Sequence, residues 1–265
     1  MAEETLGQHG TVQEPKKKKK GFLFWASLVV MITALIALGV IGLGYLEGCM
    51  MYKDISDDAF DKNTMTVDWD KLLAINPETV GWVYIPDTNV NYPVVHTTNN
   101  EKYLTTNFRG YNSYISWGAI FMDCNNKHDC SDQNIVTYGH NMNDGSMYQL
   151  FREMADSNVF NAHRDIYFLT PAGNYTLKSF ALCHVAATEK IIMTNFGADT
   201  NRINYINDKI NRCVVSVDGS IPDPAKMSKI FTFSTCDNTA RNYRYMCFAY
   251  VVESTVDGVV GADQQ

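Results

Sequence analysis

The sequence predicts an all-β barrel or sandwich that follows a single membrane-spanning helix. Two observations carry this prediction. Residues 21–46 form an uncharged apolar run, and beyond residue 80 short β-branched or aromatic segments alternate with turn residues. Hydrophobic residues make up 46% of the 265 residues and charged residues 19%, which excludes a mainly disordered chain and leaves ample material for a core.

The apolar run 21–46 is expected to be a transmembrane helix. At 1.5 Å per residue, a helix of this length spans about 39 Å, enough to cross a bilayer with some tilt. Trp25 and Tyr45 stand near its ends, where interfacial aromatic residues are favoured. Lys16–Lys20 precede the run, so residues 1–20 are expected to be a basic cytoplasmic tail and the rest of the chain extracellular. A cleaved signal peptide is the alternative, but its apolar region is usually shorter.

Composition and motifs exclude several classes of function. Lys and Arg number 22 against 29 Asp and Glu, a net charge of −7, whereas a general nucleic-acid binder needs a basic surface. No nucleotide-binding glycine loop and no His-Glu-x-x-His motif is present, so no cofactor and no metal is expected. Cys124, His128 and Cys130 lack a fourth ligand, and the two cysteines are expected to form a small-loop disulfide or to remain free thiols.

Three helices are expected after the membrane span. Apolar residues from Trp69 to Leu73 recur at helical spacing and stop before Pro77, which predicts the first. The other two show apolar residues on one helical face, and Asp199 or Thr200 is expected to cap the later one. Their apolar positions are Tyr148, Leu150, Phe151 and Met154, then Ile203, Ile206 and Ile210.

Short β-branched and aromatic segments predict the strands, because turn residues such as Asn99-Asn100 separate them. The predicted strands cover residues 81–86, 92–96, 119–122, 134–138, 166–170, 175–187, 230–235 and 245–253. The soluble part is therefore divided into a polar tether or short N-terminal helix over 47–68, a β domain over 69–255 and a tail over 256–265.

Three residues at the ends of predicted strands predict a reactive site. Cys236 ends a β-branched and aromatic strand and polar residues follow it, which places the thiol at a rim rather than inside. His140 follows another strand, with Gly139 permitting a bend, and Arg244 begins the strand after Cys236. Taken alone, Cys236 would be a half-buried thiol, His140 a turn histidine and Arg244 a solvated cation. Together they suggest nucleophilic catalysis.

Cys183 and His184 are a less favourable candidate for a catalytic pair. They are adjacent on a predicted strand, where neighbouring side chains point to opposite faces, so they cannot act on each other. Both are expected to pack in the core.

The segments around His140 and Cys236 resemble those of class B sortases. Tyr138–Met142 with Asp144–Met147 resembles the histidine segment of that family. Thr232–Asp237 resembles its Thr-Leu-x-Thr-Cys signature, with Phe233 in place of Leu. The resemblance runs from about residue 69 to residue 252 and includes residues 76–82, 91–95, 100–104 and 118–123.

The resemblance implies a closed barrel of about eight strands with N-terminal helices and one or two inserted helices. It also implies a membrane-anchored cysteine transpeptidase with a single span, a cytoplasmic N-terminus and an extracellular catalytic domain. Such enzymes cleave the C-terminal sorting signal of a surface protein after a Thr, form a thioester, and transfer the new carboxyl end to an amine, usually of peptidoglycan.

The resemblance also assigns residues. Cys236 and His140 are the implied catalytic pair, and Arg244, which fits the family's strand pattern better than Arg241, is the implied basic partner. The implied substrate-binding residues are Asn100, Leu104, Tyr138, Ser234, Thr235 and Asp237. For Leu104 and Tyr138, a position in the barrel core is an equally good interpretation.

Other functions stay open at this point. The acyl group could pass to a Lys amine of a pilin, or to water in a cysteine peptidase or amidase, and a membrane-anchored binding module with an inactive barrel is the alternative outside enzymes. Any disulfide pairing among the remaining cysteines also stays open: Cys49, Cys124, Cys130, Cys183, Cys213 and Cys247.

Overall fold

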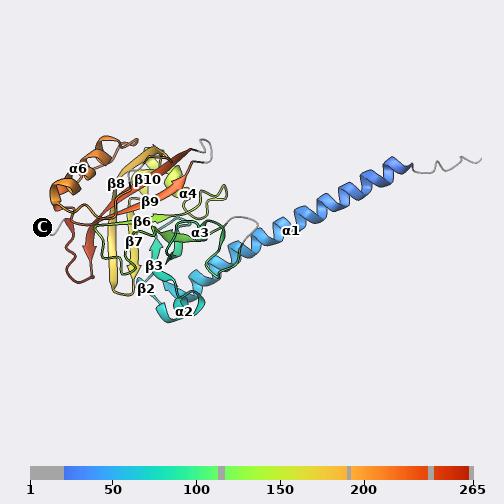
Figure 1. Cartoon of the computed structure of the whole chain (residues 1–265), viewed down its shortest axis with the longest axis horizontal. Coiled ribbons are helices and arrows are strands. Elements are labelled where there is room, and N and C mark those ends of the chain that lie inside the picture. The colour runs from blue at the N-terminus through green and yellow to red at the C-terminus, as the bar shows by residue number, and fades with distance from the viewer. Residues whose placement is uncertain (1–20, 113–116, 190–191, 238–241, 263–265) are drawn as a thin grey trace, which may run out of the picture. The chain divides into compact units, whose positions relative to one another are not determined.

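The structure is a computed structural model that describes residues 21–112, 117–189, 192–237 and 242–262 (Figure 1). Lys16–Lys20 and Arg241 lie outside the described residues. The chain divides into two units, residues 1–43 and residues 44–265.

Helix α1 runs without interruption from Phe22 to Ala59. It is long and apolar enough to cross a membrane, which makes it the candidate for the predicted span. The helix also continues through much of the polar segment that the sequence left as a tether or a short helix. Met51, Tyr52, Ile55 and Ala59 are buried along one face of this continuation. The segment is therefore helical because that face packs against the rest of its unit.

The soluble part is a closed barrel, as the sequence predicted, and its strands follow the order β10-β8-β7-β3-β4-β5-β6-β9 (Figure 1). The barrel strands are β3 (Thr79–Tyr84), β4 (Asn91–His96), β5 (Ile120–Met122), β6 (Asn134–Tyr138), β7 (Asp165–Thr170), β8 (Gly173–Ala186), β9 (Ile230–Cys236) and β10 (Tyr243–Ser254). A short ribbon of β1 (Phe60–Asp61) and β2 (Thr66–Val67), which the sequence did not predict, precedes the barrel.

The pairing of β6, β9 and β10 determines where the site forms. Strands β6 and β9 are parallel neighbours, with Tyr138 opposite Ser234. Strand β10 is antiparallel to β9, with Arg244 opposite Cys236. Because parallel strands end at the same edge of a sheet, the residues that follow β6 and those that end β9 meet at one edge of the barrel, where β10 begins.

Short helices fill the connections. They are α2 (Trp69–Ile75), α3 (Lys102–Thr105), α4 (Gln149–Glu153), α5 (Ser157–Ala162), α6 (Asp199–Asn211) and the 3₁₀ helix η1 (Pro224–Lys226). Helices α2, α4 and α6 were predicted, whereas α3 and α5 were not. The predicted cap of α6 was wrong: Ala198 occupies the N-cap without a side-chain bond, and Asp199 pairs with Arg202 at 3.1 Å instead.

All seven cysteines are free thiols. Of the two alternatives for Cys124 and Cys130, the structure therefore has the free thiols and not the loop disulfide. Cys130 is buried, and its Sγ lies 3.8 Å from Sδ of Met122, so it packs as a small apolar residue.

Candidate active site

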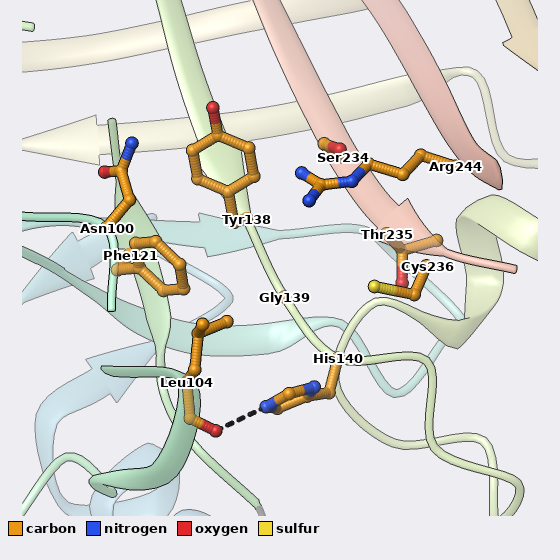
Figure 2. Close-up of a pocket in the computed structure, with 10 residues that line it drawn as sticks. All are labelled: Asn100, Leu104, Phe121, Tyr138, Gly139, His140, Ser234, Thr235, Cys236 and Arg244. Carbon is orange, nitrogen blue, oxygen red and sulfur yellow. Dashed lines mark hydrogen bonds between the residues drawn. The ribbon is translucent and has the colours of Figure 1, made fainter. Parts of the chain in front are cut away.

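A pocket of about 210 Å³ opens at the edge where β6 and β9 end (Figure 2). It brings together every residue that the sequence predicted for the site except Asp237. It also includes Phe121, which was not predicted, and Gly139, which was predicted only to permit a bend. The lining consists of Asn100, Leu104, Phe121, Tyr138, Gly139, His140, Ser234, Thr235, Cys236 and Arg244.

Cys236 is displayed at the end of an otherwise buried strand. The six residues of β9 before it are buried, whereas Cys236 is exposed, and the other six cysteines of the chain are buried or partly buried. Arg244 lies directly opposite on β10, and side chains of opposed residues share one face of a sheet. Figure 2 shows the guanidinium and the thiol entering the same pocket.

His140 reaches the pocket from the turn after β6. Its Nε2 lies 2.6 Å from the carbonyl oxygen of Leu104, and Figure 2 shows the ring between Leu104 and Cys236. Within the described part of the chain, no hydrogen bond joins His140 to the thiol of Cys236. The imidazole is therefore held at the pocket by backbone contacts and not by the thiol.

Gly139 is needed for a reason other than the predicted bend. A Cβ at this position would lie 2.5 Å from Cδ1 of Ile120 and 2.6 Å from Cγ of Tyr148. The chain therefore needs glycine here because β6 leaves the barrel in close contact with its neighbours, and a larger residue would displace His140.

A buried carboxylate organises the wall opposite Cys236. Asp123, which is 3% exposed, accepts hydrogen bonds at Oδ2 from the Tyr138 hydroxyl at 2.5 Å and from Nδ2 of Asn100 at 3.0 Å. Burial, followed by the charge of Asp123, raises the pKa of Tyr138, so its phenol stays protonated and donates. The sequence placed Asp123 in a family-like segment but gave it no role.

The two residues left open between core and pocket are both in the pocket lining. Leu104 is 42% exposed, so it is not a barrel core residue. Tyr138 is buried apart from the side that lines the pocket, and its ring packs 5.2 Å from that of Phe121.

Three polar atoms of the lining are buried without a hydrogen-bond partner among the described residues: Ser234 Oγ, Thr235 Oγ1 and Arg244 Nε. Buried polar groups without partners are uncommon because each costs about 1–3 kcal/mol. Their concentration in one pocket makes it suited to a ligand that carries polar groups, such as a peptide.

Asp237 and His184 pair with each other, which the sequence did not predict. Asp237 Oδ2 lies 2.9 Å from His184 Nε2, outside the pocket lining. His184 was expected in the core, but its side chain is 29% exposed. It stacks on the rings of Tyr243 and Tyr245 at 4.9 and 4.4 Å. No sequence pattern indicated this pair, because the two residues come from different strand ends.

Comparison with known proteins identifies the family to which this fold belongs. The profile of the sortase domain matches residues 83–252. Sortase B of Listeria monocytogenes is 31% identical over 172 residues, which cover 65% of this chain and 68% of that protein. Among solved structures, sortase B from B. anthracis in complex with AAEK1 matches with a TM-score of 0.68 at 28% identity, covering 80% of this chain and 99% of that chain.

Sortase B from Clostridium perfringens matches with a TM-score of 0.64 at 28% identity, covering 70% of this chain and 100% of that chain. The resemblance seen in the sequence is thus confirmed across most of the barrel. The chain belongs to the sortase family, in its class B, whose members are cysteine transpeptidases that act on peptides.

Proposed function

We propose that this protein is a membrane-anchored class B sortase that cleaves a C-terminal sorting signal after a Thr and transfers the shortened surface protein to an amine of peptidoglycan. The observation that carries the proposal is the pocket that collects a thiol, an imidazole and a guanidinium from three strand ends, Cys236, His140 and Arg244. The proposed reaction requires no metal and no cofactor.

The proposed mechanism begins at Cys236. Its thiolate attacks the carbonyl carbon of the scissile Thr, and the C–N bond breaks to leave a thioester. A free cysteine has a pKa of about 8.5, so little of it is thiolate at neutral pH. A protonated His140 nearby would favour the thiolate by pairing with its negative charge. The imidazolium then gives its proton to the leaving amine and later takes one from the incoming amine.

The other residues of the pocket complete the proposed site. Because Nε2 of His140 is held by the Leu104 carbonyl, Nδ1 is the nitrogen that would exchange the proton. Arg244 would stabilise the negative oxygen that develops at the Thr carbonyl, or hold the substrate backbone. Ser234 and Thr235 would offer the sorting peptide their hydroxyls, which have no hydrogen-bond partner among the described residues, and Leu104 would offer an apolar contact.

The proposed domain organisation serves this chemistry. Residues 1–20 would be a cytoplasmic tail, 21–46 the span, 47–68 a connecting segment, 69–255 the catalytic domain and 256–265 a tail. A substrate that shares the membrane surface with the enzyme has a higher effective concentration without any new contact.

The test offers the full chain, in detergent, a library of peptides with Thr-containing sorting motifs, with and without added amines. We expect a thioester on Cys236 by mass spectrometry and transfer products that exceed hydrolysis when an amine is present. A Cys236→Ala variant that retains turnover would refute the mechanism. Equal hydrolysis with and without amine would indicate a peptidase, a preference for a pilin Lys amine over peptidoglycan amines would indicate pilus assembly, and no thioester would indicate a binding module.

A further inference from the structure

The C-terminal turns of α1 make close contact with the segment that borders the pocket. Tyr52, on the buried face of this helix, is 4% exposed. Its hydroxyl donates to the carbonyl oxygen of Gly118 at 2.5 Å and accepts from the backbone N–H of Phe108 at 3.2 Å. One side chain of the helix therefore binds two points of the segment formed by the described residues 103–112 and 117–119.

The same segment packs against one edge of the imidazole of His140. A Cβ at Gly118 would lie 2.9 Å from Cδ2 of His140, so the backbone of Gly118 packs directly against the ring. At the same edge of the ring, the carbonyl oxygen of Leu104 lies 2.6 Å from Nε2. The backbone N–H of Ala119 bonds to the carbonyl of Tyr103 at 3.0 Å, which joins the two ends of the segment next to the ring.

We propose that Tyr52 is a positioning residue for His140, and that the helix which leads out of the membrane is part of the framework of the active site. The inference rests on the proposed function for the role of His140. Tyr52 fixes Gly118 and Phe108, and through them the segment that contacts the Cδ2 and Nε2 edge of the imidazole. Without the hydroxyl, the Leu104 carbonyl and Gly118 can shift together, and the ring loses its orientation toward Cys236.

A second contact of α1 supports the same role. Gly48 lies one helical turn before Tyr52, and a Cβ there would lie 2.4 Å from Nε1 of Trp117. Trp117 is buried and immediately precedes Gly118. Glycine at position 48 therefore lets the helix approach the segment closely enough for Tyr52 to reach it.

Tyr52→Phe tests the proposal because it removes the hydroxyl and keeps the ring. We expect kcat for transpeptidation by the full chain to fall about tenfold with KM within about twofold, since a small misplacement of a catalytic group costs rate more than binding. Thr170→Val is the matched control. It removes another buried hydroxyl, which donates to the carbonyl oxygen of Gly173 at 2.8 Å, and leaves Gly118 and the pocket lining untouched. We expect it to lose comparable stability and to keep kcat.

A readout independent of turnover is the exchange of the imidazole C2 hydrogen, followed by mass spectrometry as a function of pH. In Tyr52→Phe the exchange curve of His140 should shift, while that of His184 should stay unchanged. Gly48→Ala, which pushes α1 away from Trp117, should produce the same shift. An unchanged His140 curve and unchanged kcat in both variants would overturn the inference. A wild-type chain without transpeptidation would refute the proposed function instead, and the exchange curves would still decide the role of Tyr52.

Discussion

The side-chain amide of Asn141 donates a hydrogen bond from Nδ2 to the carbonyl oxygen of Cys236 at 2.9 Å. Asn141 is 8% exposed and follows His140 directly, so this bond joins the turn after β6 to the last residue of β9. It fixes the separation of the two strand ends that carry the imidazole and the thiol. The geometry of the site thus depends on this hydrogen bond between Asn141 and the backbone of Cys236 as well as on its reactive groups.

Asn141→Ala should therefore impair both rate and stability. We expect kcat/KM to fall about tenfold because the two strand ends are no longer joined. The free energy of unfolding should fall by about 1–2 kcal/mol because a carbonyl loses its buried donor. Enzyme kinetics and denaturant unfolding measure the two effects. Asn207→Ala, at an exposed position of α6, is the control and should change neither. Equal kinetics in both variants would contradict the role given to Asn141.

Ser234→Ala should weaken substrate binding without weakening the fold. The Ser234 hydroxyl is buried without a partner among the described residues, so its removal costs no intramolecular hydrogen bond. We expect KM for the sorting peptide to rise severalfold and the unfolding midpoint to stay or increase. Thr232→Val is the matched control two residues earlier on β9, where the hydroxyl donates to Asn134 Oδ1 at 2.9 Å, away from the pocket. It should lose about 1 kcal/mol of stability and keep KM. A reversed pattern would exclude a substrate contact at Ser234.

Cys236 should be the first thiol to react with iodoacetamide in the folded chain. It is exposed, whereas burial raises the pKa of Cys130, Cys183 and Cys247 to about 12 each. At pH 8, a thiol with this raised pKa has a thiolate fraction about a thousandfold lower than that of a free cysteine. Peptide mapping after brief labelling should find one modified site, and Cys236→Ala should remove the fast phase. Fast labelling of any buried thiol would show that the barrel opens more readily than its packing suggests.

The parts of the fold that were predicted from sequence are those with a local signal. Alternating β-branched segments with turn residues between them predicted the barrel strands, and the spacing of Ile203, Ile206 and Ile210 predicted α6. The continuation of α1 had no such signal, because its polar sequence becomes helical through the burial of one face, on which Tyr52 lies. The four-residue helix α3 is likewise too short to show periodicity.

In the candidate site, too, some contacts were predicted from the sequence and others were not. Strand ends placed Cys236, His140 and Arg244 together because strand order alone brings them to one edge. The contact of Asp237 with His184 depends instead on the register of β8 against β10, which no single segment of the sequence contains.

Lys229 should give the stability of the protein a distinct pH dependence. Its side chain is 6% exposed, and Nζ donates to the carbonyl oxygens of Cys130 and Asp132 at 2.6 and 2.5 Å. Burial is the main cause that lowers its pKa to about 8, whereas an unfolded lysine has a pKa of about 10.4. Between these two values the unfolded chain binds more protons than the folded chain. The contribution of Lys229 to stability therefore rises with pH through this window and is constant below it.

Lys229→Met removes this contribution and keeps an apolar side chain of similar length. From pH 8 to pH 10, the free energy of unfolding of the wild type should rise by about 2 kcal/mol more than that of the variant. Other groups titrate in this range, but they are common to both chains, so denaturant unfolding at several pH values isolates the lysine. Lys226→Met, at an exposed position of η1, should follow the wild-type curve. Parallel curves for Lys229→Met and the wild type would mean that water reaches the ammonium group and keeps its pKa near the ordinary value.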